Sequence, residues 1–164
     1  MNVIVTPAGV DFGRGLRRAA FGRSGIGVKA REGDGLTPVG VWPVRRALYR
    51  ADRLDKPRSA LPLTAIAPDD GWCDAPSHPA YNTQIKTPFT ASHETLWRDD
   101  HLYDVVIIVG FNDAPVIAGK GSAIFIHVAR PDFGPTEGCI ALAQDDLLEL
   151  LALLLPSDAV TVSA

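Results

Sequence analysis

Apolar residues fall in short runs between polar, turn-forming segments, and the second half of the chain holds the clearest of these runs. Residues 104–111 and 124–129 are rich in β-branched and aromatic residues and have strand length, which is typical of buried strands. Residues 144–155 begin with acidic residues, continue with leucines and are followed by Pro156, so they predict a helix. Residues 159–162 (Ala-Val-Thr-Val) predict a closing strand.

The first half is more irregular. Residues 3–5 predict a short strand, and residues 11–27 predict loop with one helical turn or a strand fragment because they hold five glycines. Residues 39–48 predict a strand that Pro43 confines to an edge or a bulge. Residues 51–92 contain six prolines and predict mostly ordered loop. Strands dominate, so we expect a β-rich α+β fold in a single domain over residues 1–164.

Composition excludes some function classes. The chain has 164 residues, a net charge of −3, 46% hydrophobic and 21% charged residues, so nothing favours a nucleic-acid partner. The longest apolar stretch, residues 147–155, contains Glu149 and is too short to span a bilayer, so no membrane association is expected. Acidic residues interrupt the basic ones of the first third, which predicts a solvated surface for them: Arg14, Arg17, Arg18, Arg23, Lys29, Arg31, Arg45, Arg46, Arg50 and Arg53.

The N-terminus and the cysteines bear on location. The start, Met1 to Pro7, has no basic leader and no cleavage site, which favours a cytoplasmic protein, although a periplasmic chain without its leader would look the same. Cys73 and Cys139 are too few for a disulfide framework and lack metal-ligand spacing. The carboxylates near His93 could suggest a metal site, but their spacing matches no common ligand set, so no metal or cofactor is expected. A single bridge between them is possible but disfavoured in the cytosol.

The candidate chemistry centres on His127, at the end of an apolar run, and Cys139, which follows Gly138. A thiol is a poor nucleophile until a base takes its proton or a local field lowers its pKa, and an imidazole can do both. Gly138 lets the backbone approach a substrate closely, and the amides of Gly138 and Cys139 are candidate oxyanion donors. Equally, buried cysteines are often inert and a histidine at a strand end is often structural.

Two segments carry a family resemblance. His127 followed by Thr136-x-Gly138-Cys139-Ile140-x-Leu142, together with the turn-rich entry at residues 33–42, resembles the L,D-transpeptidase catalytic domain (YkuD-like) family over about residues 26–162. The resemblance implies a mixed β-sandwich with a helix before the C-terminal strand. Proteins of this family form a cysteine thioester with the diaminopimelate acyl group of a peptidoglycan stem peptide. D-alanine leaves, and an amine or water then takes the acyl group.

The resemblance implies a role for each matching residue. Cys139 would be the nucleophile and His127 its base, with the Val128 carbonyl orienting the imidazole and Gly138 and Cys139 supplying oxyanion amides. Three positions depart from the family pattern: Glu137 replaces a second histidine, Ala141 replaces an asparagine or arginine, and the loop of residues 128–135 is shorter. These departures alter the acceptor side of the cleft.

Other side chains are candidates for binding the stem peptide, which is the expected partner. Arg130 either binds the carboxylate of a terminal D-alanine, because arginine binds carboxylates in bidentate fashion, or is an ordinary surface arginine. Lys86 and Arg98 are weaker candidates. Glu94 or Asp104 would pair with an amino group of diaminopimelate. The remaining substrate-binding candidates are Tyr103, Thr136, Glu137, Trp72 and Tyr81, of which Trp72 and Tyr81 either wall the substrate or pack the proline-rich segment onto the sheet.

The sequence therefore predicts a cysteine-dependent L,D-acyl-transfer enzyme. The favoured hypothesis is an L,D-carboxypeptidase that releases D-alanine from muropeptide tetrapeptides during cell-wall recycling. One alternative is an L,D-transpeptidase that forms peptidoglycan cross-links. Another is a non-catalytic muropeptide-binding module, in which Glu137 and Ala141 mark loss of activity.

Overall fold

The main element of the fold is one mixed, ten-stranded sheet in a computed structural model that describes residues 1–164. The strand order is β3-β2-β1-β15-β7-β12-β13-β14-β4, and β8 pairs with β7. The pairs β1–β15, β13–β14 and β7–β8 are parallel and the others antiparallel. The bounds are β1 (Asn2–Thr6), β2 (Gly9–Asp11), β3 (Leu16–Arg17), β4 (Ala19–Ala20), β7 (Gly40–Tyr49), β8 (Leu63–Ala65), β12 (Val105–Val109), β13 (Phe125–Val128), β14 (Ile140–Leu142) and β15 (Ala159–Val162).

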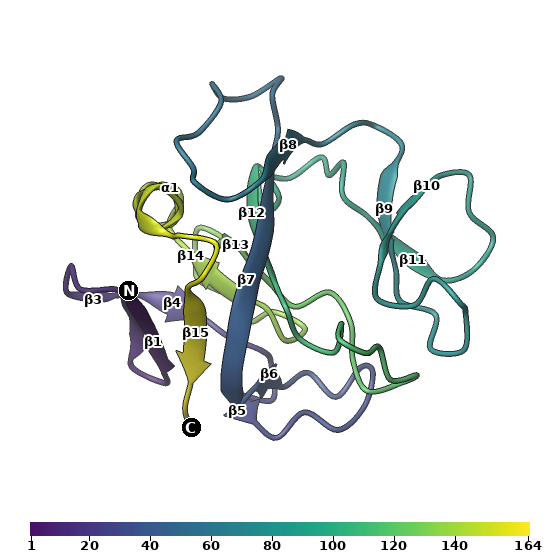
Figure 1. Cartoon of the computed structure of the whole chain (residues 1–164), viewed down its shortest axis with the longest axis horizontal. Helices are drawn as coiled ribbons and strands as arrows, with labels where there is room; N and C mark the ends of the chain where they lie inside the picture. Colours follow the sequence, from purple (N-terminus) through teal and green to yellow (C-terminus); the bar gives the residue numbers. More distant parts are fainter.

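The sheet curls until its two ends meet. β3 and β4 stand at opposite ends of the strand order, yet only Arg18 separates them along the chain. A single residue cannot span a flat sheet of this width, and β4 indeed contacts β2 near the other end. The sheet therefore wraps around an interior (Figure 1).

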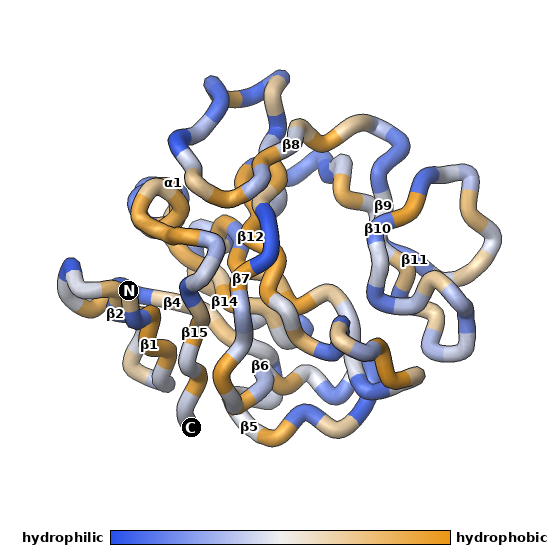
Figure 2. The backbone as a smooth tube through the Cα atoms, in the orientation of Figure 1, coloured by the Kyte–Doolittle hydropathy of each residue, from blue (hydrophilic) through white to orange (hydrophobic).

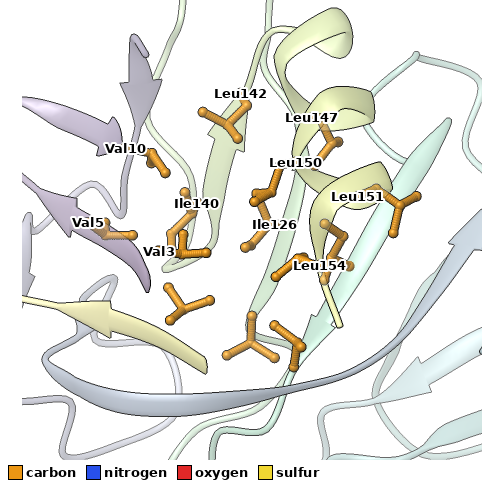
Figure 3. Packing of buried hydrophobic residues seen from close by; sticks show 14 of the residues in the cluster. Val3, Val5, Val10, Ile126, Ile140, Leu142, Leu147, Leu150, Leu151 and Leu154 are labelled. Atoms are coloured by element: carbon orange, nitrogen blue, oxygen red, sulfur yellow. The ribbon is translucent and has the colours of Figure 1, made fainter. Parts of the chain in front are cut away.

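The inside of the curl is filled by a cluster of 22 buried hydrophobic residues, here called the inner core. Helix α1 (Gln144–Leu153) contacts β12 and β13. Its leucines point into the same interior as Val3, Val5, Ile126 and Ile140 (Figure 3). Leu147, Leu150 and Leu151 are fully buried, and each such side chain contributes roughly 1.5–3 kcal/mol of transfer free energy.

The other side of the main sheet carries a three-stranded antiparallel sheet, β10-β9-β11, formed by β9 (Asp70–Cys73), β10 (Gln84–Lys86) and β11 (His93–Thr95). It lies on the far side of β7 and β12 from α1 (Figure 1). Between the two sheets is a second cluster of ten buried residues, the outer cluster, which includes Leu48, Trp72, Phe125 and Cys139. A short parallel pair, β5 (Ile26–Gly27) and β6 (Thr37–Pro38), completes the strands.

The structure confirms the elements expected from the clearest apolar runs. β12, β13, α1 and β15 lie where the sequence predicts them, and the fold is β-rich with one helix before the final strand. Residues 51–92 are mostly loop, as predicted, but they also contain the short strands β8, β9 and β10. These strands have only three or four residues each, and their apolar residues are too few to show alternation.

Pro43 is not at an edge. Residues 40–43 of β7 pair with β15, and Val44 to Tyr49 pair with β12, so β7 is interior and Pro43 lies where the strand changes its partner. The missing N–H is tolerated at that point, while the Pro43 carbonyl accepts a 2.7 Å hydrogen bond from the Gly110 amide. The predicted bulge is present two residues later, because Ile108 pairs with Arg46 and Val109 with Val44.

Two basic residues also depart from the predicted solvated surface. Lys29 and Arg50 are 6% and 3% exposed, respectively. Each has a carboxylate partner, Asp34 for Lys29 and Asp52 for Arg50, and such pairing permits burial of a charge. Hydrophilic segments otherwise gather in the outer loops, such as the one leading into β8, while β12 and α1 are largely hydrophobic (Figure 2). The only helix, α1, is too short to cross a bilayer.

Candidate active site

His127 faces away from the inner core because of strand alternation. Within β13, Ile126 and Val128 belong to the inner core, whereas Phe125 belongs to the outer cluster. Successive side chains of a strand point to opposite faces, so His127 shares the face of Phe125. The strand is fixed on both sides, with His127 paired to Val106 of β12 and to Ala141 of β14.

The imidazole of His127 is held in one tautomer. Its Nδ1 lies 2.9 Å from the Val128 carbonyl, and since a carbonyl only accepts, Nδ1 must carry the hydrogen. The neutral ring then has its lone pair on Nε2. Burial lowers the pKa of His127 from 6.5 to about 4, against the opposing effect of the Val128 hydrogen bond. The edge-on ring of Tyr103, 5.3 Å away between centroids, packs against the imidazole.

Cys139 is positioned by a segment that is tied to the start of the chain. Thr136 forms a bridge with Gly22, and its hydroxyl donates to the Cys139 carbonyl at 2.7 Å. Gly138 has φ +141°, and a Cβ there would lie 2.8 Å from the Leu36 carbonyl oxygen. Only glycine fits this approach, which explains the Gly-Cys dipeptide in structural terms.

The surroundings of Cys139 favour a neutral thiol. It donates to the Ala123 carbonyl at 3.1 Å, and the Phe125 amide points at its sulfur from 3.4 Å. Burial raises the pKa of Cys139 to about 12, and the nearby Glu94 carboxyl adds to that rise. Cys73 is also a free, buried thiol, so the structure contains no bridge between the two cysteines.

The two candidate oxyanion amides differ. The Gly138 amide donates to the Thr136 hydroxyl at 3.1 Å, whereas the Cys139 amide donates to no protein acceptor. In this conformation the Cys139 amide is the available donor, and the Gly138 amide requires a small turn adjustment before it can serve.

His127 and Cys139 line one pocket of about 370 Å³, the Cys139 pocket. Six further residues predicted as substrate-binding candidates lie on its wall: Glu94, Arg98, Tyr103, Arg130, Thr136 and Glu137. Ala141 also lines it, next to His127 in register, so its small side chain leaves space beside the imidazole. Glu137 forms an exposed ion pair with Arg23 at 3.0 Å.

The pocket has an uneven charge pattern. Lys29 and Arg98, two of its three cations, are paired with Asp34 at 2.6 Å and Asp100 at 2.7 Å. Arg130 is exposed and forms no ion pair. Glu94 accepts a 2.8 Å hydrogen bond from the Tyr103 hydroxyl, yet burial raises its pKa from 4.5 to about 7. A free guanidinium in such a pocket is suited to a carboxylate.

Four predicted substrate residues lie elsewhere. Trp72 is 5% exposed within the outer cluster, and Tyr81 is 2% exposed with its hydroxyl on Glu32, so both support the structure behind the pocket wall. The packing alternative for these two aromatics is therefore the one that the structure shows. Lys86 pairs with Asp69 and Asp70, and Asp104 pairs with Arg53 and His101.

Several lining residues were not predicted, namely Lys29, Glu32, Asp74 and Ser122. One signal was available: Asp34 stands between Gly33 and Gly35, a typical turn sequence. Its carboxylate accepts from the backbone amides of Ala30, Arg31 and Leu36. Nothing in the pattern indicates that Lys29 would fold onto it. No group of three or more His, Cys, Asp or Glu residues is arranged to hold a metal ion.

The comparison with protein families gives a match over most of the chain. The model of the YkuD family, described as the L,D-transpeptidase catalytic domain, matches residues 8–162. No significant match was found among curated proteins or solved structures. Members of the family are cysteine L,D-transpeptidases that act on peptidoglycan peptides. With nearly its whole length covered by that match, the chain belongs to the L,D-transpeptidase catalytic domain family.

Proposed function

We propose that this chain is an L,D-carboxypeptidase that removes the terminal D-alanine from muropeptide tetrapeptides. The observation that carries the proposal is Arg130, the one unpaired cation of the pocket that also holds Cys139 and His127. A peptide whose scissile carbonyl reaches Cys139 would place the carboxylate of its last residue near this guanidinium.

The proposed chemistry assigns one task to each group. Cys139 Sγ is the nucleophile, and His127 Nε2 is the base, because Nδ1 is occupied by the Val128 carbonyl. The Cys139 amide stabilises the oxyanion, joined by the Gly138 amide after it leaves the Thr136 hydroxyl.

The proposed reaction has two steps, acylation of Cys139 and hydrolysis of the thioester. Sγ attacks the carbonyl before D-alanine while His127 takes the thiol proton, and the C–N bond breaks as that proton passes to the leaving amine. A thioester and free D-alanine result. Water then attacks the thioester, His127 takes its proton, and the tripeptide leaves as the thiol is reprotonated.

The resting pocket must change before this can happen. With the pKa of Cys139 near 12 and that of His127 near 4, the proton stays on sulfur and both groups are neutral. The thiol hydrogen also points at the Ala123 carbonyl rather than at the imidazole. Substrate binding is therefore expected to turn the thiol toward Nε2 and to offset the charge of Glu94, so that the thiolate forms only in the presence of a donor peptide.

Hydrolysis is favoured over transfer by the size of the site. A pocket of about 370 Å³ lies at the low end of the usual range for small-ligand sites. It suits one peptide end and a water molecule better than two peptides. The proposed substrate is accordingly a free muropeptide.

The direct test is to incubate the protein with disaccharide tetrapeptide, with and without an added amine acceptor, and to identify products by mass spectrometry. Tripeptide plus D-alanine as the main product under both conditions supports the proposal. A product in which the acceptor amine replaces D-alanine identifies the transpeptidase alternative, which the carboxylate of Glu137 at the pocket rim would favour by attracting an ammonium group.

A second candidate, the non-catalytic muropeptide-binding module, is favoured by the protonated thiol and the occupied Gly138 amide. It predicts that iodoacetamide modifies Cys139 no faster than Cys73, even with tetrapeptide present. Preferential modification of Cys139 that is lost in His127→Ala excludes this candidate.

A further inference from the structure

A second cavity of about 200 Å³ lies on the same side of the main sheet as the Cys139 pocket, but it is distinct from it. The two cavities share only Ile124 among their lining residues. The second one, here called the Arg46 cavity, lies where β7, β12 and β13 meet the three-stranded sheet β10-β9-β11. Its walls include Trp72, Ile108 and Phe125.

Arg46 occupies a position that would normally be apolar. It stands two residues before Leu48 on β7, so the two side chains share a face, and Leu48 belongs to the outer cluster. Its register partner is Ile108, another member of that cluster. The guanidinium is half-buried between the two sheets, and burial lowers its pKa. Taking a charge out of water in this way is costly unless the charge has a partner.

No protein group satisfies that guanidinium. Two carboxylates of this region already hold other cations. Asp113 accepts two hydrogen bonds of 2.9 and 3.0 Å from Arg45, and Asp70 pairs with Lys86 at 2.9 Å. Asp70, whose negative charge raises the pKa of Arg46, also accepts a hydrogen bond from Gln84. Arg46 itself forms no hydrogen bond and no ion pair; its one specific contact is with the Trp72 ring, 5.9 Å from the centroid.

The atoms of Arg46 are open to the cavity rather than sealed off. No guanidinium nitrogen of Arg46 is both fully buried and unpartnered, so these nitrogens keep some access to solvent, and the residue lines the cavity. A guanidinium offers five donors in a planar fork that matches a carboxylate. The Gln84 amide nitrogen is used on Asp70, which leaves its carbonyl oxygen as an acceptor beside the same space.

We propose that the Arg46 cavity is a binding site for a small carboxylate that also carries an N–H group, such as the end of an N-acylated amino acid. The carboxylate binds the Arg46 guanidinium, the N–H donates to the Gln84 carbonyl, and the apolar part lies against Ile108 and Phe125. The volume restricts the ligand to a few heavy atoms beyond the carboxylate. This site does not depend on the function proposed for Cys139.

The test is an NMR titration of the full chain that follows the Arg46 Nε–Hε signal. The probe is N-acetylglycine, and N-acetylglycinamide serves as the matched neutral compound. A saturable shift with a millimolar Kd for the acid, and at least tenfold weaker binding of the amide, is the expected result. No saturable shift, or equal binding of acid and amide, would overturn the proposal without the need for any variant.

Three arginine substitutions test whether N-acetylglycine binds at Arg46. Arg46→Gln should weaken N-acetylglycine binding at least tenfold, measured by the shifts of the Trp72 and Gln84 side-chain signals. Arg45→Gln is the matched control, because Arg45 lines the same cavity but is already paired with Asp113, and it should change Kd less than about twofold. Arg130→Gln must leave the response unchanged; loss of the response in that variant would place the probe in the Cys139 pocket and refute the Arg46 site.

Discussion

The two faces of β13 contact very different surroundings. Ile126 and Val128 point into the inner core, where all 22 buried side chains are hydrophobic. Phe125 and His127 point to the other side, where Cys139, Glu94 and Tyr103 gather around a pocket. One face of this four-residue strand therefore packs into the inner core, and the other face carries the candidate catalytic histidine.

The difference explains how a buried histidine can be held in place without an ion pair. The inner core fixes the backbone of β13, and the backbone fixes His127 through the Val128 carbonyl at 2.9 Å. A site carried by a packed strand is held more firmly than one on a loop. It follows that changes on the pocket face should affect activity, whereas changes on the core face should affect stability.

The largest expected effect comes from His127→Ala. Removal of the base should lower D-alanine release from tetrapeptide by about 10²–10⁴-fold, while the thermal midpoint changes little because no inner-core contact is lost. His101→Ala is the matched control, since His101 is exposed and lies on Asp104 outside the pocket, and it should retain most activity. Equal losses in the two variants would refute the role of His127.

Leu150→Ala tests the core face. Leu150 is fully buried on α1, so its truncation should lower the free energy of unfolding by about 2–5 kcal/mol, read from urea denaturation. Activity measured well below the midpoint should stay within about twofold. The exposed Leu155 provides the control, because Leu155→Ala should cost no more than about 0.5 kcal/mol. A stable but inactive Leu150→Ala protein would contradict the separation of the two faces.

Arg130→Gln should act on binding. The loss of one charge-assisted contact of about 1.5–3 kcal/mol should raise KM for the tetrapeptide about 10–100-fold with a smaller change in kcat. Arg23→Gln is the comparison, because Arg23 is occupied by Glu137 and does not line the pocket. An unchanged KM in Arg130→Gln would remove the observation on which the carboxypeptidase proposal rests.

The smallest expected effect is a pH dependence of stability that Glu94→Gln uncovers. The pKa of Glu94 rises from 4.5 to about 7 on folding, so the folded chain keeps a proton that the unfolded chain loses, and stability falls with pH across that range. The pKa of His127 falls from 6.5 to about 4, so stability rises with pH between these values. The two contributions oppose each other between about pH 4.5 and 6.5.

Glu94→Gln removes only the falling contribution. Between pH 4.5 and 6.5 its free energy of unfolding, read from urea denaturation, should therefore rise more than that of the unmodified chain. The expected difference is on the order of 1 kcal/mol once solvent access to the carboxyl is allowed for. Parallel pH profiles for the two proteins would show that Glu94 is not the group that offsets His127.

The elements that pack on the inner core were easier to predict from the sequence than those on the opposite side of the main sheet. β12, β13 and α1 were predictable because inner-core residues form continuous apolar runs. His127 and Cys139 were predictable from a local motif. The three-stranded sheet was not predictable, because β9 has only four residues and its partners β10 and β11 have three each. These strands are held together by pairings that no local sequence pattern encodes.

The rest of the site depends on long-range contacts. The sequence left open whether Trp72 and Tyr81 wall the substrate or pack the chain, because their burial follows from partners far along the chain, Phe125 for Trp72 and Glu32 for Tyr81. Burial of Lys29 likewise depends on the fold of the turn around Asp34. Side-chain type alone cannot distinguish a lining residue from one that lies just behind the wall.

Cys139 is the proposed nucleophile of L,D-peptide hydrolysis, and the most direct test of this role compares the two buried thiols. D-alanine release from disaccharide tetrapeptide should be measured for the unmodified chain, Cys139→Ala and Cys73→Ala. We predict that Cys139→Ala loses at least about 10³-fold of the activity, whereas Cys73→Ala, which changes a thiol outside the pocket, keeps it. Undiminished release by Cys139→Ala, or no release by the unmodified chain, would contradict this account.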